Sequence, residues 1–153
     1  MRARSRRSGE RGAALIEFVL VAPLFLLIML GAIDWGWYFV LRETLVNATR
    51  EGARIASVQD NPQAQSTAAA IAAVRGYLTN VGVTAVPVVS PDVQFTCITV
   101  PGVATPVQAI QVSLAGYQAG PISGLALTLI PDTITAQTVM RLEVQPAVPA
   151  CPP

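Results

Sequence analysis

The chain has 153 residues and a formal net charge of +1, with 52% hydrophobic and only 12% charged residues. Soluble proteins average roughly a quarter charged residues, so this composition points to a membrane anchor beside at most one small domain. Histidine is absent, which removes the commonest general base and the commonest metal ligand. We therefore expect no enzyme, no cofactor and no metal site.

Residues 1–12 form a basic leader. Its five arginines against Glu10 give about +4, which leaves about −3 for the rest of the chain. Because the remainder is mildly acidic, we expect no nucleic-acid partner. Arginines next to an apolar run instead keep that end of the chain on the cytoplasmic side of a membrane.

An apolar run of 21 residues, 13–33, follows the leader. As a helix it would span about 31 Å, close to the thickness of a bilayer core. Trp35, Trp37 and Tyr38 come just after it, where an interfacial aromatic belt would lie. A cleaved signal peptide fits poorly, because its apolar region is shorter and ends in a small-x-small site. The run predicts one transmembrane helix, kinked at Pro23 but continuous.

Glu17 is the one carboxylate inside this run. A charge within a membrane span costs about 3 kcal/mol even on lenient insertion scales. The side chain could simply reach back to the cytoplasmic interface. Alternatively, if the chain is cut between Gly12 and Ala13, the new amino group of a neighbouring subunit could pair with Glu17, and this would fix the register between helices. We favour the second interpretation.

The helix is predicted to continue over 39–57 in amphipathic form, so that 13–57 is one long helix. Its apolar stripe recurs at spacings of three and four residues: Leu41, Leu45, Ala48, Gly52 and Ile55. Charged residues lie largely off the stripe: Arg42, Glu43, Arg50, Glu51 and Arg54. One side of this segment should pack and the other should face water.

Residues 58–153 are predicted to form a small extracytoplasmic α+β domain with a Pro-rich tail. A second, short helix over 62–79 should pack on an antiparallel sheet of about four strands, predicted at 83–89, 93–100, 107–115 and 133–144. The segment 121–131 is apolar without a clear period. It is either a buried loop, which we favour, or a surface that meets the membrane or a partner.

Two cysteines, Cys97 and Cys151, lie beyond the span. On the oxidising side of a membrane they could form a disulfide, and two unrelated thiols are the alternative.

The leader boundary resembles a type IV prepilin-type cleavage site: Gly12, then Ala13, with Glu17 at the fifth position after the glycine and Phe18 at the sixth. The helix motif Arg50, Glu51, Gly52, Ala53 and Arg54, together with the ending Ile134 to Glu143, is similar to TadE-like proteins, minor pseudopilins of tight-adherence (Flp) pilus systems. Gly9 is a second glycine in the leader, but a cut there would displace Glu17 from the motif position.

The resemblance implies processing by a prepilin peptidase and a role in pilus assembly or anchoring at the bacterial inner membrane. The implied partners are the peptidase, other pilins or pseudopilins, the inner-membrane assembly platform and the lipid bilayer. The alternative is an uncleaved, membrane-anchored binding module of the cell envelope or of a secretion system. For that class, Glu17→Ala should have little effect.

Overall fold

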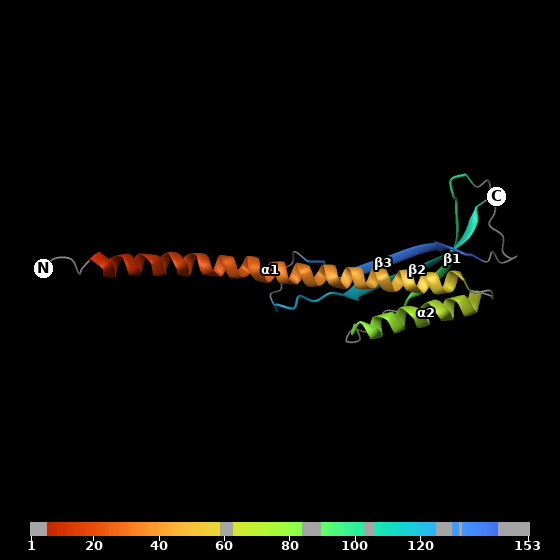
Figure 1. Cartoon of the computed structure of the whole chain (residues 1–153), viewed down its shortest axis with the longest axis horizontal. Coiled ribbons are helices and arrows are strands. Elements are labelled where there is room, and N and C mark those ends of the chain that lie inside the picture. Colours follow the sequence, from red (N-terminus) through yellow and green to blue (C-terminus); the bar gives the residue numbers. More distant parts are fainter. Residues whose placement is uncertain are drawn as a thin grey trace. The chain divides into compact units, whose positions relative to one another are not determined.

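The computed structural model describes residues 6–58, 63–83, 90–102, 106–124, 130–131 and 133–143. In chain order its elements are α1 (Arg6–Ser57), α2 (Gln63–Asn80), β1 (Asp92–Ile98), β2 (Val107–Gln118) and β3 (Thr133–Arg141). The predicted α+β class is confirmed (Figure 1). Among the described residues the sheet has three strands, not about four. The strand predicted at 83–89 falls almost wholly outside the described residues.

Two compact units make up the chain. The anchor unit comprises residues 1–38 with 121–130, and the head unit comprises 39–120 with 131–153. In the anchor unit, most large apolar side chains of α1 between Leu15 and Trp37 are exposed, for example Leu20 and Phe25. From Gly12 onward α1 is long and apolar enough to cross a membrane. The helix passes through Pro23 without interruption, as predicted.

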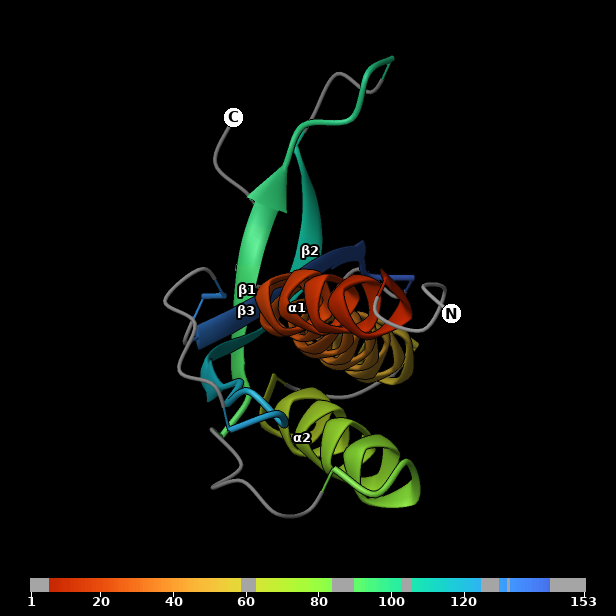
Figure 2. The same cartoon turned by 90° about the vertical axis from the view of Figure 1, so that its left-hand side faces the viewer.

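The head unit has a core between the helices and one face of the sheet. Figure 2 shows α2 beside the second half of α1, with both next to the strands. The strands are antiparallel in the order β1-β2-β3. Alternate residues of β2 and β3 point into the core because side chains alternate along a strand. Those that point inward and are buried include Ile110, Val112 and Leu114 of β2 with Ile134 and Ala136 of β3. Val107, Ala109 and Tyr117 of β2 are buried as well.

The stripe predicted along α1 is buried, except that Ile55 is only half-buried. The buried surface of α1 is wider than predicted, since Thr49, Ala53 and Ala56 are also fully inaccessible. The reason is that α1 packs against both α2 and the sheet, whereas a single stripe of contacts would serve only one neighbour. Small residues on both sides allow these two neighbours to approach closely.

Thr138 is the one polar residue on the inward face of β3, and the structure explains it. The hydroxyl of Thr49 on α1 lies 2.9 Å from the hydroxyl of Thr138. The same Thr49 hydroxyl donates to the carbonyl of Val46 at 2.9 Å, so Thr138 is the donor in the pair. A hydrogen bond between α1 and β3 thus gives the half-buried Thr138 hydroxyl an acceptor in the buried Thr49 hydroxyl.

The chain after β3 returns to the end of α1. The amide of Glu143 donates to the carbonyl of Ser57 at 3.0 Å, and the amide of Leu142 donates to the carbonyl of Gln108 at 3.0 Å. Ser57 is the last residue of α1, where helix carbonyls lack partners within the helix. The first of these bonds therefore joins the end of α1 to the end of the sheet.

Candidate functional site

The predicted processing site lies on the exposed part of α1. Gly12, Ala13, Glu17 and Phe18 are all exposed, and no heavy atom lies within 4 Å of where a Cβ on Gly12 would stand. Phe18 has 68% of its surface accessible. The structure therefore brings these residues together only as neighbours on one helix, and leaves their side chains open to molecules outside the chain.

The helix motif of residues 50–54 is divided between two environments. Gly52 and Ala53 are buried, whereas Arg50 and Arg54 are exposed and Glu51 is half-buried. A Cβ at Gly52 would stand 2.6 Å from Val74 Cγ2 of α2 and 3.1 Å from the carbonyl oxygen of Ala70. Gly52 is thus a point of close approach between α1 and α2, and a residue without a Cβ permits that approach.

The charged residues of the motif form an ion pair on the helix surface. Arg54 donates to Glu51 through Nε at 3.0 Å and through Nη2 at 2.8 Å. The Arg54 hydrogen bond lowers the pKa of the Glu51 carboxyl below its usual value, and the same contact raises the pKa of Arg54. Exposed pairs of this kind contribute little to stability.

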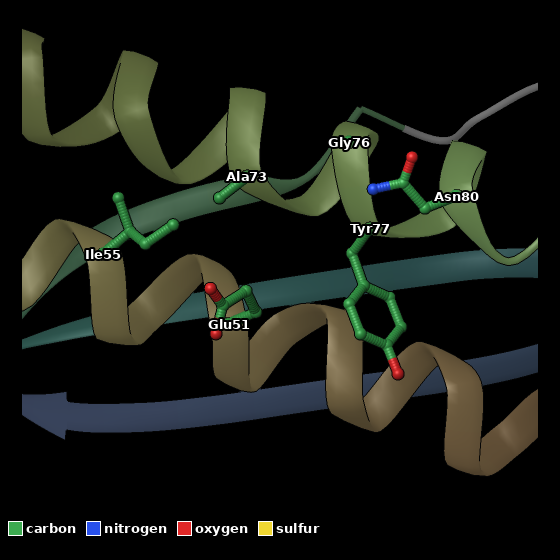
Figure 3. A pocket seen from close by; sticks show the side chains of 6 residues that line it. All are labelled: Glu51, Ile55, Ala73, Gly76, Tyr77 and Asn80. Atoms are coloured by element: carbon green, nitrogen blue, oxygen red, sulfur yellow. The ribbon is translucent and has the colours of Figure 1, made fainter.

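A shallow pocket of about 450 Å³ opens between α1 and α2 in the head unit. Figure 3 shows Glu51 and Ile55 from α1 facing the α2 residues, with the Tyr77 ring extending toward α1. Ala73 and Gly76 leave this space because their side chains are small or missing. The Glu51 carboxylate at its edge is already hydrogen-bonded to Arg54. Of the residues predicted as sites, only Glu51 lines this pocket.

Cys97 lies exposed on β1, and the part of the chain that the structure describes contains no free cysteine. Cys151 lies outside the described residues, so its pairing with Cys97 stays a prediction. Within the described ranges no three Cys, Asp or Glu side chains are grouped so as to hold a metal ion.

Sequence reasoning missed a polar contact in the anchor unit. Asp34 is 1% exposed, and its carboxylate accepts two hydrogen bonds from Ser123. The backbone N–H of Ser123 donates to Oδ1 at 2.9 Å and the hydroxyl donates to Oδ2 at 2.5 Å. The available signals were a carboxylate directly after the apolar run and a Ser-Gly pair in the uncharged segment 121–131. Nothing in the spacing links them.

The same segment was predicted, by preference, to be a buried loop. In the structure Pro121, Ile122 and Gly124 are exposed, Ser123 is half-buried and Ile130 is buried. The described part is therefore mixed, with exposed residues at its start and at Pro131. Ser123 joins residues 121–124 to Asp34 through its two hydrogen bonds.

Comparison with known families is consistent with this geometry. The profile of the family described as TadE-like protein matches residues 12–54. The match begins at Gly12 and ends at Arg54, so it takes in the proposed cleavage site, the apolar run and the helix motif. No curated protein and no solved structure matches the chain significantly. The resemblance drawn from the residues is confirmed over this region: residues 12–54 are similar to TadE-like proteins.

Proposed function

We propose that this chain is a minor pseudopilin of a Tad/Flp type IV pilus system. It is made with the leader 1–12, cut by a prepilin peptidase after Gly12, and acts in pilus assembly or anchoring through packing of its N-terminal helix. The observation that carries the proposal is the exposed anchor. Among the described residues, most apolar side chains of α1 over residues 12–33 are exposed and none is buried.

Glu17 is the residue of this exposed surface that we propose to pair with a neighbouring subunit. Its neighbours Ile16 and Phe18 are 66% and 68% exposed, and Glu17 itself is exposed and has no polar partner among the described residues. In a bilayer such a carboxylate is costly unless a partner neutralises it. The amino group of Ala13 on an adjacent processed helix is a partner of the right charge. The pair would fix the axial register of two packed helices, with one pair per contact.

The proposed partners and location follow from the same features. The arginines of the leader hold the N-terminus in the cytoplasm, so the head unit is extracytoplasmic and the chain crosses the bacterial inner membrane once. The partners are the prepilin peptidase, other pilins or pseudopilins, the inner-membrane assembly platform and the surrounding lipid. The chain is then either retained at the membrane or incorporated in the pilus.

The cleavage step is tested by a matched pair of leader variants. Gly12→Leu should block processing, whereas Gly9→Leu should be processed like the wild type. A side chain at Gly12 meets nothing within 4 Å, so Gly12→Leu leaves the fold of the chain undisturbed and acts only on the peptidase. The measurement is N-terminal sequencing and intact mass of the protein extracted from membranes.

The wild-type protein should begin at Ala13. A mature protein beginning at Glu10 would move the cut to Gly9 and remove Glu17 from its motif position. An intact Met1 in cells that make pili would refute the processed pseudopilin and favour the uncleaved binding module.

The assembly step is tested at Glu17. Glu17→Gln should be cut normally but should lose co-purification with other pilin-like subunits, because the amide cannot neutralise an amino group. Glu43→Gln is the control, since Glu43 is an exposed carboxylate on α1 beyond the apolar run. Equal co-purification of both variants and the wild type would remove the role assigned to Glu17.

A further inference from the structure

The contact between Asp34 and Ser123 ties a distant turn to the end of the apolar run. Both oxygens of the Asp34 carboxylate are used, one by the backbone N–H and one by the hydroxyl of Ser123. Hydrogen bonds to an ionised group are stronger than neutral ones, and two parallel bonds also fix orientation. The turn Pro121–Gly124 is therefore held at the level of residue 34 along α1.

That level coincides with the edge of a bilayer. Asp34 directly follows Ile33, the last residue of a 21-residue apolar run whose helical length matches a bilayer core. Trp35 and Trp37 follow, and both are exposed at 37% and 41%. Exposed tryptophans next to an apolar span are typical of the membrane–water interface.

We propose that the turn Pro121–Gly124 is a second membrane contact, with Ile122 inserted in the outer interface of the same bilayer that residues 13–33 cross. Ile122 is 58% exposed. A single exposed isoleucine on a water-facing surface needs no explanation. Here, however, the turn belongs to the same compact unit as the anchor and is bonded at the depth of the aromatic belt. Its four residues carry no charge, so nothing in it opposes insertion.

The bonds to Asp34 make such a position possible for both partners. Aspartate is too short to reach far along a helix toward water, and a buried carboxylate without hydrogen bonds is strongly unfavourable. An unpaired backbone N–H is also unfavourable near hydrocarbon. The Asp34 carboxylate, the Ser123 N–H and the Ser123 hydroxyl satisfy one another, so these three groups can lie near lipid without being unpaired.

Photochemical cross-linking of the full chain in bilayer nanodiscs tests the proposal. A diazirine-bearing amino acid replaces Ile122 in one protein, Phe25 in a second and Val58 in a third. Phe25 lies within the apolar run, and Val58 is an exposed residue at the far end of α1. We expect lipid adducts at position 122 in a yield comparable with position 25, and background yield at position 58. Adducts are identified by mass spectrometry.

A second arm breaks the contact. Asp34→Ala should lower the lipid adduct yield at position 122 by roughly ten-fold, since hydrogen bonds to charged groups are among the stronger ones. Asp92→Ala is the control, because Asp92 is an exposed carboxylate of β1 in the head unit, and it should leave the yield unchanged. An Asp34 variant that failed to fold would not affect the first arm, which retains the contact.

Three results would overturn the proposal. The first is a yield at position 122 no higher than at position 58. The second is cross-linking at position 122 to protein without lipid, which would mark a subunit interface. The third is an absence of lipid adducts at position 25, which would show that the apolar run is not in the membrane. If adducts were absent at position 122 alone, the membrane anchor and the pseudopilin proposal would both stand.

Discussion

Gly52 offers the sharpest test of the head fold, because an alanine there should be harmful where alanine is normally favourable. In the middle of a helix Gly→Ala stabilises by about 0.8–1.0 kcal/mol. At Gly52 the new methyl group would stand 2.6 Å from Val74 Cγ2, 3.1 Å from the Ala70 carbonyl oxygen and 3.7 Å from Val112 Cγ1. The first distance requires a movement, and valine has little rotamer freedom in a helix.

The second distance involves backbone, so relief there requires α2 to shift as a whole. Overpacking of this kind costs about 1–3 kcal/mol. Set against the gain in helix propensity, Gly52→Ala should therefore be destabilising by about 1 kcal/mol. The closely packed Val74 is fully buried.

Gly76→Ala is the matched control. Gly76 lies in the interior of α2 in the same head unit, and no heavy atom lies within 4 Å of its would-be Cβ. It should show the propensity gain alone, so the two identical substitutions should change stability in opposite directions. Pulse proteolysis of the full chain in nanodiscs across a urea series measures both. If Gly52→Ala stabilises the head as much as Gly76→Ala, the close approach of α1 and α2 at Gly52 is refuted.

Three further predictions concern the head unit and use the same assay. Thr138→Val should lower the free energy of unfolding by about 1 kcal/mol, because it removes the donor to the buried Thr49 hydroxyl. The double variant with Thr49→Val should lose less than the sum of the two single losses, and strict additivity would show that the hydroxyls do not interact. Leu45→Ala should lower the free energy of unfolding by about 2–5 kcal/mol, because Leu45 is only 1% exposed. Val40→Ala, at an exposed position of α1, should lower it far less, and similar losses for the two variants would contradict the assigned core. Burial raises the pKa of Tyr117 above its ordinary value of 10.0, so as the pH rises the tyrosine loses its proton in the unfolded chain before it does so in the folded one. The free energy of unfolding should therefore fall as the pH rises above 10.0, and Tyr117→Phe should remove the contribution of this tyrosine to that fall.

The anchor and the apolar stripe could be predicted from the sequence because both are local patterns. A run of 21 apolar residues and a recurrence at three and four positions each describe a single helix, and neither depends on a distant partner. The meaning of Gly52 could not be predicted in the same way. From the sequence, a glycine inside a helix is expected only to lower the stability of that helix. The position of Val74 on another helix shows why a glycine is tolerated there.

The end of β2 illustrates a different limit. The strand was predicted over 107–115, yet it continues to Gln118. The pairing with β3 shifts register between Leu114 and Tyr117, and Gly116 adopts a φ of 75°. A glycine in the left-handed region permits an irregularity of this kind within a strand. The glycine at this irregularity therefore allows the strand to continue past residue 115.

The contact of Asp34 with Ser123 joins residues 89 positions apart, and no local pattern encodes such a pairing. The TadE-like segment 12–54 has two parts with different environments, and substitutions in them should be interpreted differently. In its first part the side chains are exposed, so substitutions such as Glu17→Gln report on molecules outside the chain. In its last part Gly52 and Ala53 are buried within the head, so substitutions there report on folding. A loss of pilus assembly caused by a change at Gly52 would therefore say nothing about a binding surface unless the variant is first shown to be folded.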